Sequence, residues 1–221
     1  MSSRQEEKEQ RKAERLERER AAQAEAKRKR LLQIAGGVVV AVAIAGGVAL
    51  AVAGGGGGDR PSEAAVKSAA TAAGCVYRAF PEEGRGHTTQ PRTPANYKTN
   101  PPTSGDHNPT PAQDGSYPAG GEPDIGNWVH TLEHGRILLQ YQPNSPPATV
   151  GALQKLFEEP VANSGNSYHM VIMQNNTKMP FQTAAVAWRH YVGCKDAGPA
   201  AIKAMRMFRD RFVDKAPELI A

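Results

Sequence analysis

Two histidines and a glutamate stand close together in the segment VHTLEHG, residues 129–135. On a helix His130 and His134 share one face, so both imidazoles can bind one Zn²⁺ while Glu133 acts as a base, as in the H-x-x-E-H pattern of inverted zinc peptidases. Gly135 and a strand-like apolar run follow at once, which leaves room for a helix of only about two turns. A metallohydrolase is therefore the least favoured of three hypotheses.

A metal site without catalysis requires only that the side chains meet. His130 and His134 share a face in a helix and also in an extended strand. The turn-forming segment PPTSGD, residues 101–106, can bring His107 to them. Together with Glu133 these histidines predict a site for zinc. Copper(I) would take a thioether as well, from Met170, Met173 or Met179.

The third hypothesis gives the same histidines a structural role. Their ring nitrogens and Glu133 would hydrogen-bond to loop carbonyls and amides and fix the proline-rich segment on a sheet, without any metal. The other histidines, His87, His169 and His190, are isolated in the sequence, and we expect surface or hydrogen-bonded core positions for them.

Periodic segments predict a β-α-β-β-α core. Strands are expected over 136–141, 168–175 and 183–192, with helices over 148–159 and 198–213. Although the alanines of 183–192 also allow a helix, this order indicates a small α+β domain with helices packed on one face of its sheet. The segment 81–123 is crowded with proline, glycine and small polar residues, a composition that favours disorder.

An uncharged run at residues 31–54 contains Gln33 as its only strongly polar side chain and is long enough to cross a bilayer. A cleaved signal peptide is the alternative, but the apolar run and the basic region before it are both longer than usual for one. Four consecutive basic residues, 27–30, place the N-terminus in the cytoplasm by the positive-inside rule. We therefore expect a cytoplasmic tail (1–30), a transmembrane helix (31–54), a flexible linker (55–66) and an extracytoplasmic domain (67–221).

The net charge of +5 belongs almost entirely to the tail. Residues 1–30 hold eleven Lys and Arg and seven Glu, whereas residues 59–221 hold 16 basic and 15 acidic residues. This balance argues against nucleic acid as a partner of the globular part.

The chain has two cysteines, Cys75 and Cys194. In an extracytoplasmic domain such a pair predicts a disulfide that would close a loop of more than a hundred residues. Two free thiols are the alternative.

Several segments together resemble a bacterial, mostly actinobacterial, membrane-anchored family, domain of unknown function 3105. They are NYKTNPPTSGDH, GSYPAG, VHTLEHG, AVAW and FRDRFVDKAPE, and the resemblance covers about residues 75–218. The family motif falls on Pro101, Pro102, Thr103, Ser104, Gly105, His107, His130, Glu133, His134 and Gly135. This chain departs from the pattern at Asp106, where proline is usual, and at Asn108, where an aromatic is usual.

The resemblance implies a membrane anchor, a proline-rich region that is part of the domain, and a single unit formed by the motif histidines and Glu133. The sequence therefore predicts a single-pass membrane protein whose extracytoplasmic domain binds copper or zinc through a His/Glu cluster. The alternative is a non-enzymatic envelope interaction module, with another envelope protein as partner and structural histidines.

Overall fold

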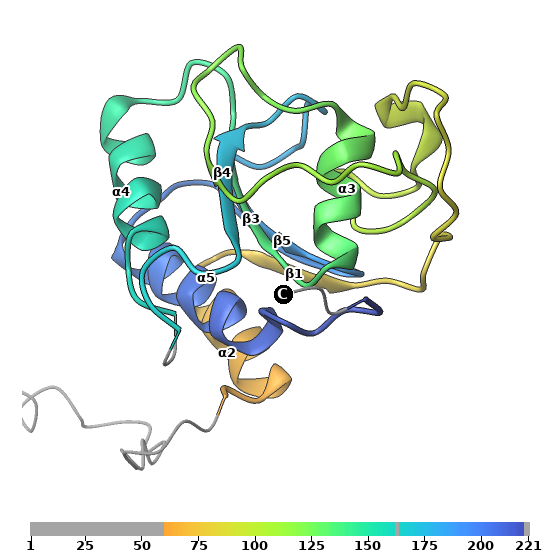
Figure 1. Ribbon diagram of the computed structural model, residues 1–221. Coiled ribbons are helices and arrows are strands. Elements are labelled where there is room, and N and C mark those ends of the chain that lie inside the picture. The colour runs from red at the N-terminus through yellow and green to blue at the C-terminus, as the bar shows by residue number, and fades with distance from the viewer. Residues whose placement is uncertain (1–59, 162–163, 219–221) are drawn as a thin grey trace, which may run out of the picture. The chain divides into compact units, whose positions relative to one another are not determined.

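The computed structural model describes residues 60–161 and 164–218. They form an α+β domain around one mixed sheet, with the strand order β1-β6-β5-β3-β4-β2 (Figure 1). The strands are β1 (Val76–Ala79), β2 (Gly115–Ser116), β3 (Ile137–Tyr141), β4 (Met170–Gln174), β5 (Thr183–Ala187) and β6 (His190–Cys194). The helices are α2 (Glu63–Ala72), α3 (Ile125–Glu133), α4 (Pro147–Phe157) and α5 (Pro199–Phe212), with a short 3₁₀ turn at Pro94–Asn96.

The strands β3 and β4 are neighbours in the sheet. They are parallel, in the register Ile137 with Met170, and α4 is the crossover between them. The next two strands, β5 and β6, form an antiparallel hairpin beside β3. The prediction of one strand over 183–192 is wrong, because the chain reverses at Arg189, whose φ of 64° is left-handed.

Helices cover both faces of the sheet (Figure 1). Leu139 points into the core beneath α2, α4 and α5, whereas its neighbour Leu138 points into a second core beneath α3. The prediction of helices on one face only is therefore wrong. A strand that is covered on both sides is apolar without alternation, and the apolar run of β3 in the sequence was a sign of this. Every residue of β3 is buried.

The proline-rich segment is an ordered part of the domain, as the family resemblance implied and contrary to its composition. Residues 101–105 are all buried. The Arg189 amide donates to the Thr103 carbonyl at 2.8 Å, and the Glu83 amide donates to Ser104 Oγ at 3.0 Å. The motif loop Pro101–Gly105 is thus held between the segment that follows β1 and the β5–β6 turn.

The predicted disulfide between Cys75 and Cys194 is confirmed. It joins the residue before β1 to the last residue of β6, two strands that are paired side by side.

The predicted cytoplasmic tail and transmembrane helix lie outside the described residues, and so do residues 55–59 of the predicted linker. The last four residues of that linker, 63–66, belong to the helix α2 instead. Among the residues that are described, none of the helices has the length and apolar character needed to cross a bilayer.

Gly135 ends α3 in a conformation that a side chain would disturb. Its φ is +81°, its amide donates to the Leu132 carbonyl, and the next amide, of Arg136, donates to Thr131. These two bonds form the Schellman arrangement that closes many helices. A Cβ at Gly135 would also lie 2.9 Å from the Cα of Asp214.

We expect Gly135→Ala to lower the free energy of unfolding by about 2 kcal/mol, from the left-handed φ and the backbone clash together. Gly151→Ala is the matched control, because Gly151 lies inside α4 and a Cβ added there would meet nothing within 4 Å. The Gly151→Ala substitution should raise the free energy of unfolding by about 0.5–1 kcal/mol. Chemical denaturation of both variants measures the difference. Equal effects of the two substitutions would contradict this account of the α3 terminus.

Candidate metal centre

The helix α3 carries the H-x-x-E-H motif and is buried nearly all round. Trp128 and Leu132 face the second core, whereas His130 and Glu133 are covered by loops on the other side. Because both sides are enclosed, polar side chains on this helix must find partners inside the protein. His134 is the C-terminal cap residue of the helix.

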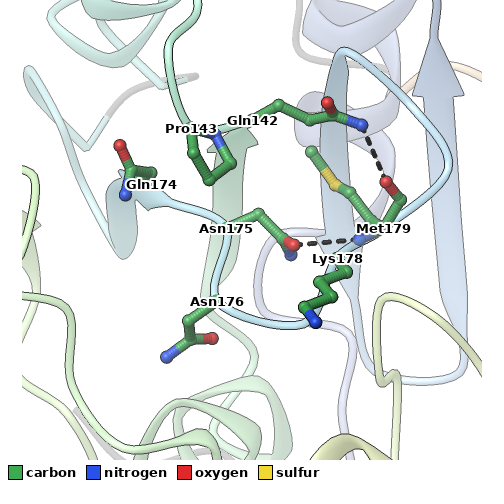
Figure 2. A pocket seen from close by; sticks show the side chains of 7 residues that line it. All are labelled: Gln142, Pro143, Gln174, Asn175, Asn176, Lys178 and Met179. Carbon is green, nitrogen blue, oxygen red and sulfur yellow. Dashed lines mark hydrogen bonds between the residues drawn. The ribbon is translucent and has the colours of Figure 1, made fainter.

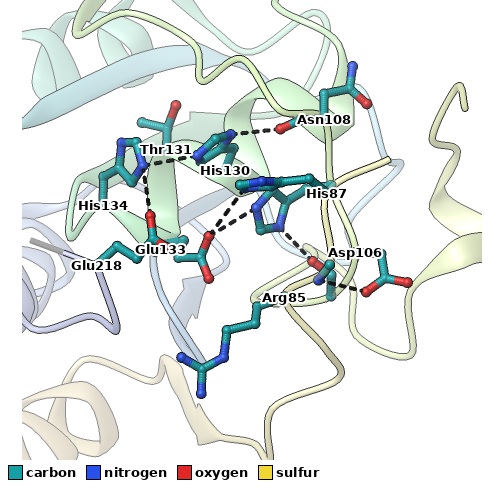
Figure 3. A network of polar contacts seen from close by, with 12 residues as sticks. Arg85, His87, Asp106, Asn108, His130, Thr131, Glu133, His134 and Glu218 are labelled. Atoms are coloured by element: carbon teal, nitrogen blue, oxygen red, sulfur yellow. Dashed lines mark hydrogen bonds and ion pairs between the residues drawn. The ribbon is translucent and has the colours of Figure 1, made fainter. Parts of the chain in front are cut away.

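Four side chains converge beside α3. The ligand atoms of His87, His107, His130 and Glu133, which we call the inner group, lie within 4.8 Å of one another. Glu133 Oε2 is 3.0 Å from His107 Nε2 and 4.0 Å from His87 Nε2. Figure 3 shows Glu133 directed at His87, and His130 beside them with its ring nitrogens directed at Asn108 and His134. His87 is 45% exposed, and the other three side chains are buried.

Two loop segments bring His87 and His107 together. The His107 amide donates to the Gly86 carbonyl, and the Thr88 amide donates to the His107 carbonyl, in a short parallel bridge. Asp106 accepts a further hydrogen bond from the Gly86 amide at 2.9 Å, which supports the same pairing of loops.

Backbone carbonyls fix the orientation of two imidazoles. His107 Nδ1 lies 2.8 Å from the Gly105 carbonyl oxygen, and His130 Nδ1 lies 2.6 Å from that of Asn108. A carbonyl can only accept, so each Nδ1 carries the proton and each Nε2 keeps a lone pair. The lone pair of His107 faces Glu133, and that of His130 accepts from His134 Nε2 at 2.9 Å. Ligating histidines in metal sites are typically held in this way by a hydrogen bond from the other ring nitrogen.

The buried acceptors of this centre receive no hydrogen bond from the described residues. Glu133 Oε1, Glu133 Oε2 and His107 Nε2 are the atoms left without a partner there. The lone pair of the imidazole thus faces the carboxylate at 3.0 Å. A buried carboxylate without donors costs several kcal/mol, and a cation between these atoms would remove that cost.

The protonation states suit a metal. Burial lowers the pKa of His107 and of His130, and burial followed by the charge of His130 lowers the pKa of His134 to about 4. Burial, followed by the nearby Glu218, raises the pKa of Glu133. The imidazoles of His107, His130 and His134 are therefore neutral at pH 7, the form that binds metal ions.

A second set of ligand atoms adjoins the first. His130, His134 and Glu218, which we call the outer group, also have ligand atoms within 4.8 Å of one another. The two Nε2 atoms of His130 and His134 are 2.9 Å apart, and His134 Nε2 is 3.6 Å from Glu218 Oε2 (Figure 3). His130 belongs to both groups.

The structure thus brings together three of the four side chains named as ligands, His107, His130 and Glu133, and places His134 next to them in the outer group. His87 has the surface position expected of it, but its membership of the inner group was missed, because a loop contact distant in sequence brings it there. Glu218 was also missed, although it closes the segment FRDRFVDKAPE that carries the family resemblance.

The remaining two histidines lie outside both groups. His169 Nδ1 is paired with Asp214 at 2.7 Å, and His190 Nδ1 donates to the Trp188 carbonyl at 2.8 Å. Both have the hydrogen-bonded roles expected of them.

A pocket of about 490 Å³ lies apart from these groups, at the carboxyl ends of β3 and β4 (Figure 2). Its amides are largely engaged: Gln142 Nε2 donates to the Met179 carbonyl, and Asn175 Oδ1 accepts from the Met179 amide. Thr177 in the same loop donates to Asn100, just before the motif loop. These polar groups hold loops together, and none of them is a metal ligand in either group.

Comparison with known proteins gives one match. The sequence profile of a family described as "Protein of unknown function (DUF3105)" matches residues 88–218, which include every member of both groups except His87. No curated protein and no solved structure matches the chain.

Proposed function

The chain belongs to the DUF3105 family of proteins of unknown function, and we propose that this member binds a divalent transition-metal ion through His87, His107, His130 and Glu133. One observation carries the proposal. Three buried ligand atoms, on His107 and Glu133, face one another without a hydrogen-bond donor from the described residues, at the place where the imidazoles are already oriented by loop carbonyls.

The donor set favours zinc. Three imidazole nitrogens and one carboxylate oxygen suit Zn²⁺, which prefers four such ligands, and also Cu²⁺. Copper(I) prefers sulfur ligands. Of the methionines considered for it, Met170 lies in the core beneath α2, α4 and α5, whereas Met173 and Met179 are buried in the second core. We therefore propose zinc as the first ion to test and copper as the second.

The proposal unites two of the hypotheses drawn from the sequence. The Nδ1 atoms of His107 and His130 hold the loop at Gly105 and Asn108, which is the structural role. The opposite atoms of the same rings are left for a metal, so the loop attachment and the metal site do not compete.

A zinc hydrolase is a second candidate, supported by the outer group. His130, His134 and Glu218 are the two histidines and one carboxylate typical of a catalytic zinc site, and the sequence between the histidines contains the required glutamate. The position of Glu133 favours binding instead, because its carboxylate lies among the ligand atoms of the inner group.

We also propose that the domain faces the outside of the cytoplasmic membrane, held by residues 31–54. The Cys75–Cys194 disulfide supports this location, because disulfides persist in oxidising compartments. Protease added to intact cells should digest the domain, and full protection until lysis would refute the topology.

Metal analysis of the purified protein tests the binding. We expect the full-length chain, purified in detergent without a histidine tag and loaded with zinc, to retain about one equivalent after desalting. His107→Ala should retain none and should still fold. His169→Asn is the matched control, since His169 lies outside both groups and asparagine tolerates its φ of 51°. A parent protein that retains neither zinc nor copper would sink the proposal.

A further inference from the structure

The inner and outer groups have one ligand in common, His130. We propose that His134 and Glu218 form a second metal position with His130, and that a metal ion enters and leaves the inner group through it. This inference rests on the proposed function, since it describes how the inner group is filled.

The two positions are alternatives for one ion. His130 donates through Nδ1 to the Asn108 carbonyl, so Nε2, which accepts from His134 Nε2 in the metal-free protein, is its one atom that can bind a metal. One lone pair binds one ion at a time. The groups therefore cannot both hold a metal with their full sets of ligands, and His130 is the ligand that can remain bound while the others exchange.

Each group has one exposed member, His87 in the inner group and Glu218 in the outer group, but only the outer group has an accessible carboxylate. Its carboxylate, on Glu218, is 46% exposed, whereas the Glu133 carboxylate of the inner group is 1% exposed. His134 lies between, with its Nε2 within 2.9 Å of His130 and 3.6 Å of Glu218. Ligand atoms thus lead in short steps from the surface to the buried centre.

The backbone holds Glu218 in this place. The Glu218 amide donates to the Glu133 carbonyl at 3.1 Å, and the Asp214 amide donates to the Gly135 carbonyl at 2.9 Å. The segment 214–218 is therefore tied across the end of α3. The backbone of Glu133 thus positions the exposed carboxylate of Glu218, while the side chain of Glu133 belongs to the inner group.

The exchange balances without redox chemistry. As an ion moves inward, its bonds to His134 and Glu218 break while bonds to His107, His87 and Glu133 form, and the bond to His130 persists. One carboxylate is present in each position, so the ion has one negative partner at both ends of the path.

Kinetics of zinc exchange test the path. Zinc-loaded, full-length protein in detergent is mixed with a chromophoric chelator to follow release, and the metal-free protein is mixed with zinc to follow uptake. We expect Glu218→Gln to slow both rates by about tenfold or more, the size of effect typical for groups that surround a metal ligand. Glu158→Gln, which removes an exposed charge at the end of α4, is the matched control and should change neither rate.

Each other outcome has a distinct meaning. Unchanged uptake and release in Glu218→Gln would overturn the path. Faster release with reduced retention would also overturn it, by making Glu218 a ligand of the resting ion. If Glu218→Gln fails to fold, His134→Gln serves as the second test with the same expectation. A parent protein that takes up no zinc or copper refutes the proposed function itself, before the path is at issue.

Discussion

Glu133→Gln is expected to abolish metal binding and, at the same time, to make the metal-free protein more stable. Glutamine has the shape of glutamate but carries no charge. Its amide would replace a buried carboxylate that receives no hydrogen bond from the described residues, and would itself donate to His107 Nε2, now 3.0 Å from the carboxylate oxygen. Removing an unpaired buried charge should raise the free energy of unfolding by about 1–2 kcal/mol at pH 7.

In the presence of zinc the order of stabilities reverses. An ion bound only by the folded protein stabilises it by about 2.7 kcal/mol at a concentration one hundred times its Kd. The parent protein gains this stabilisation and the Glu133→Gln variant does not. Denaturation of both proteins with zinc and with a chelator measures the four free energies, and Glu158→Gln should behave as the parent in both conditions.

The same variant separates the three hypotheses. Loss of metal with a more stable metal-free protein supports the binding site. Retained metal with loss of a hydrolytic activity would support the zinc hydrolase, in which Glu133 is the base. A variant less stable than the parent in the chelator would show that the Glu133 carboxylate stabilises the fold without a metal, as the structural hypothesis requires.

The fold could be predicted where an apolar pattern extends along a whole helix or strand. The helices α4 and α5 and the strands β3 and β4 have apolar patterns that the structure bears out within a few residues. The helix α3 also has an apolar stripe, formed by Ile125, Trp128, Val129 and Leu132, but the segment is short and Gly135 follows it, so only a possible helix of two turns was expected there. The hairpin of β5 and β6 was merged into one strand because its turn, at Trp188 and Arg189, contains no glycine or proline.

The site could be predicted only in part, for a different reason. His130 and Glu133 lie within one turn of helix, so their sequence spacing suffices. His87 reaches the inner group through a backbone bridge to His107, and Glu218 reaches the outer group through a hydrogen bond to the Glu133 carbonyl. Contacts of this kind depend on the tertiary fold and leave no periodic signal in the sequence.

Removal of the disulfide should have the largest effect on stability outside the metal site. Cys75 and Cys194 are 119 residues apart, so the bond restricts nearly the whole described domain in its unfolded state. Chain entropy gives almost 5 kcal/mol for such a loop, and measured effects are commonly about 2–4 kcal/mol. We expect a loss in this range for the Cys75→Ala/Cys194→Ala double variant, measured by chemical denaturation.

The folded state offers a reason why the metal site should survive this change. The first core contains the disulfide together with Val66 and Ala70 of α2, whereas Trp128 and Leu132 of α3 pack on the opposite face of the sheet. Pairing of β1 with β6 also holds the Cys75 end in place without the bond. The folded double variant should therefore retain zinc as the parent does. The parent treated with a reductant should have the same lowered stability as the double variant. Loss of zinc from a folded double variant would show instead that the two faces of the sheet depend on each other.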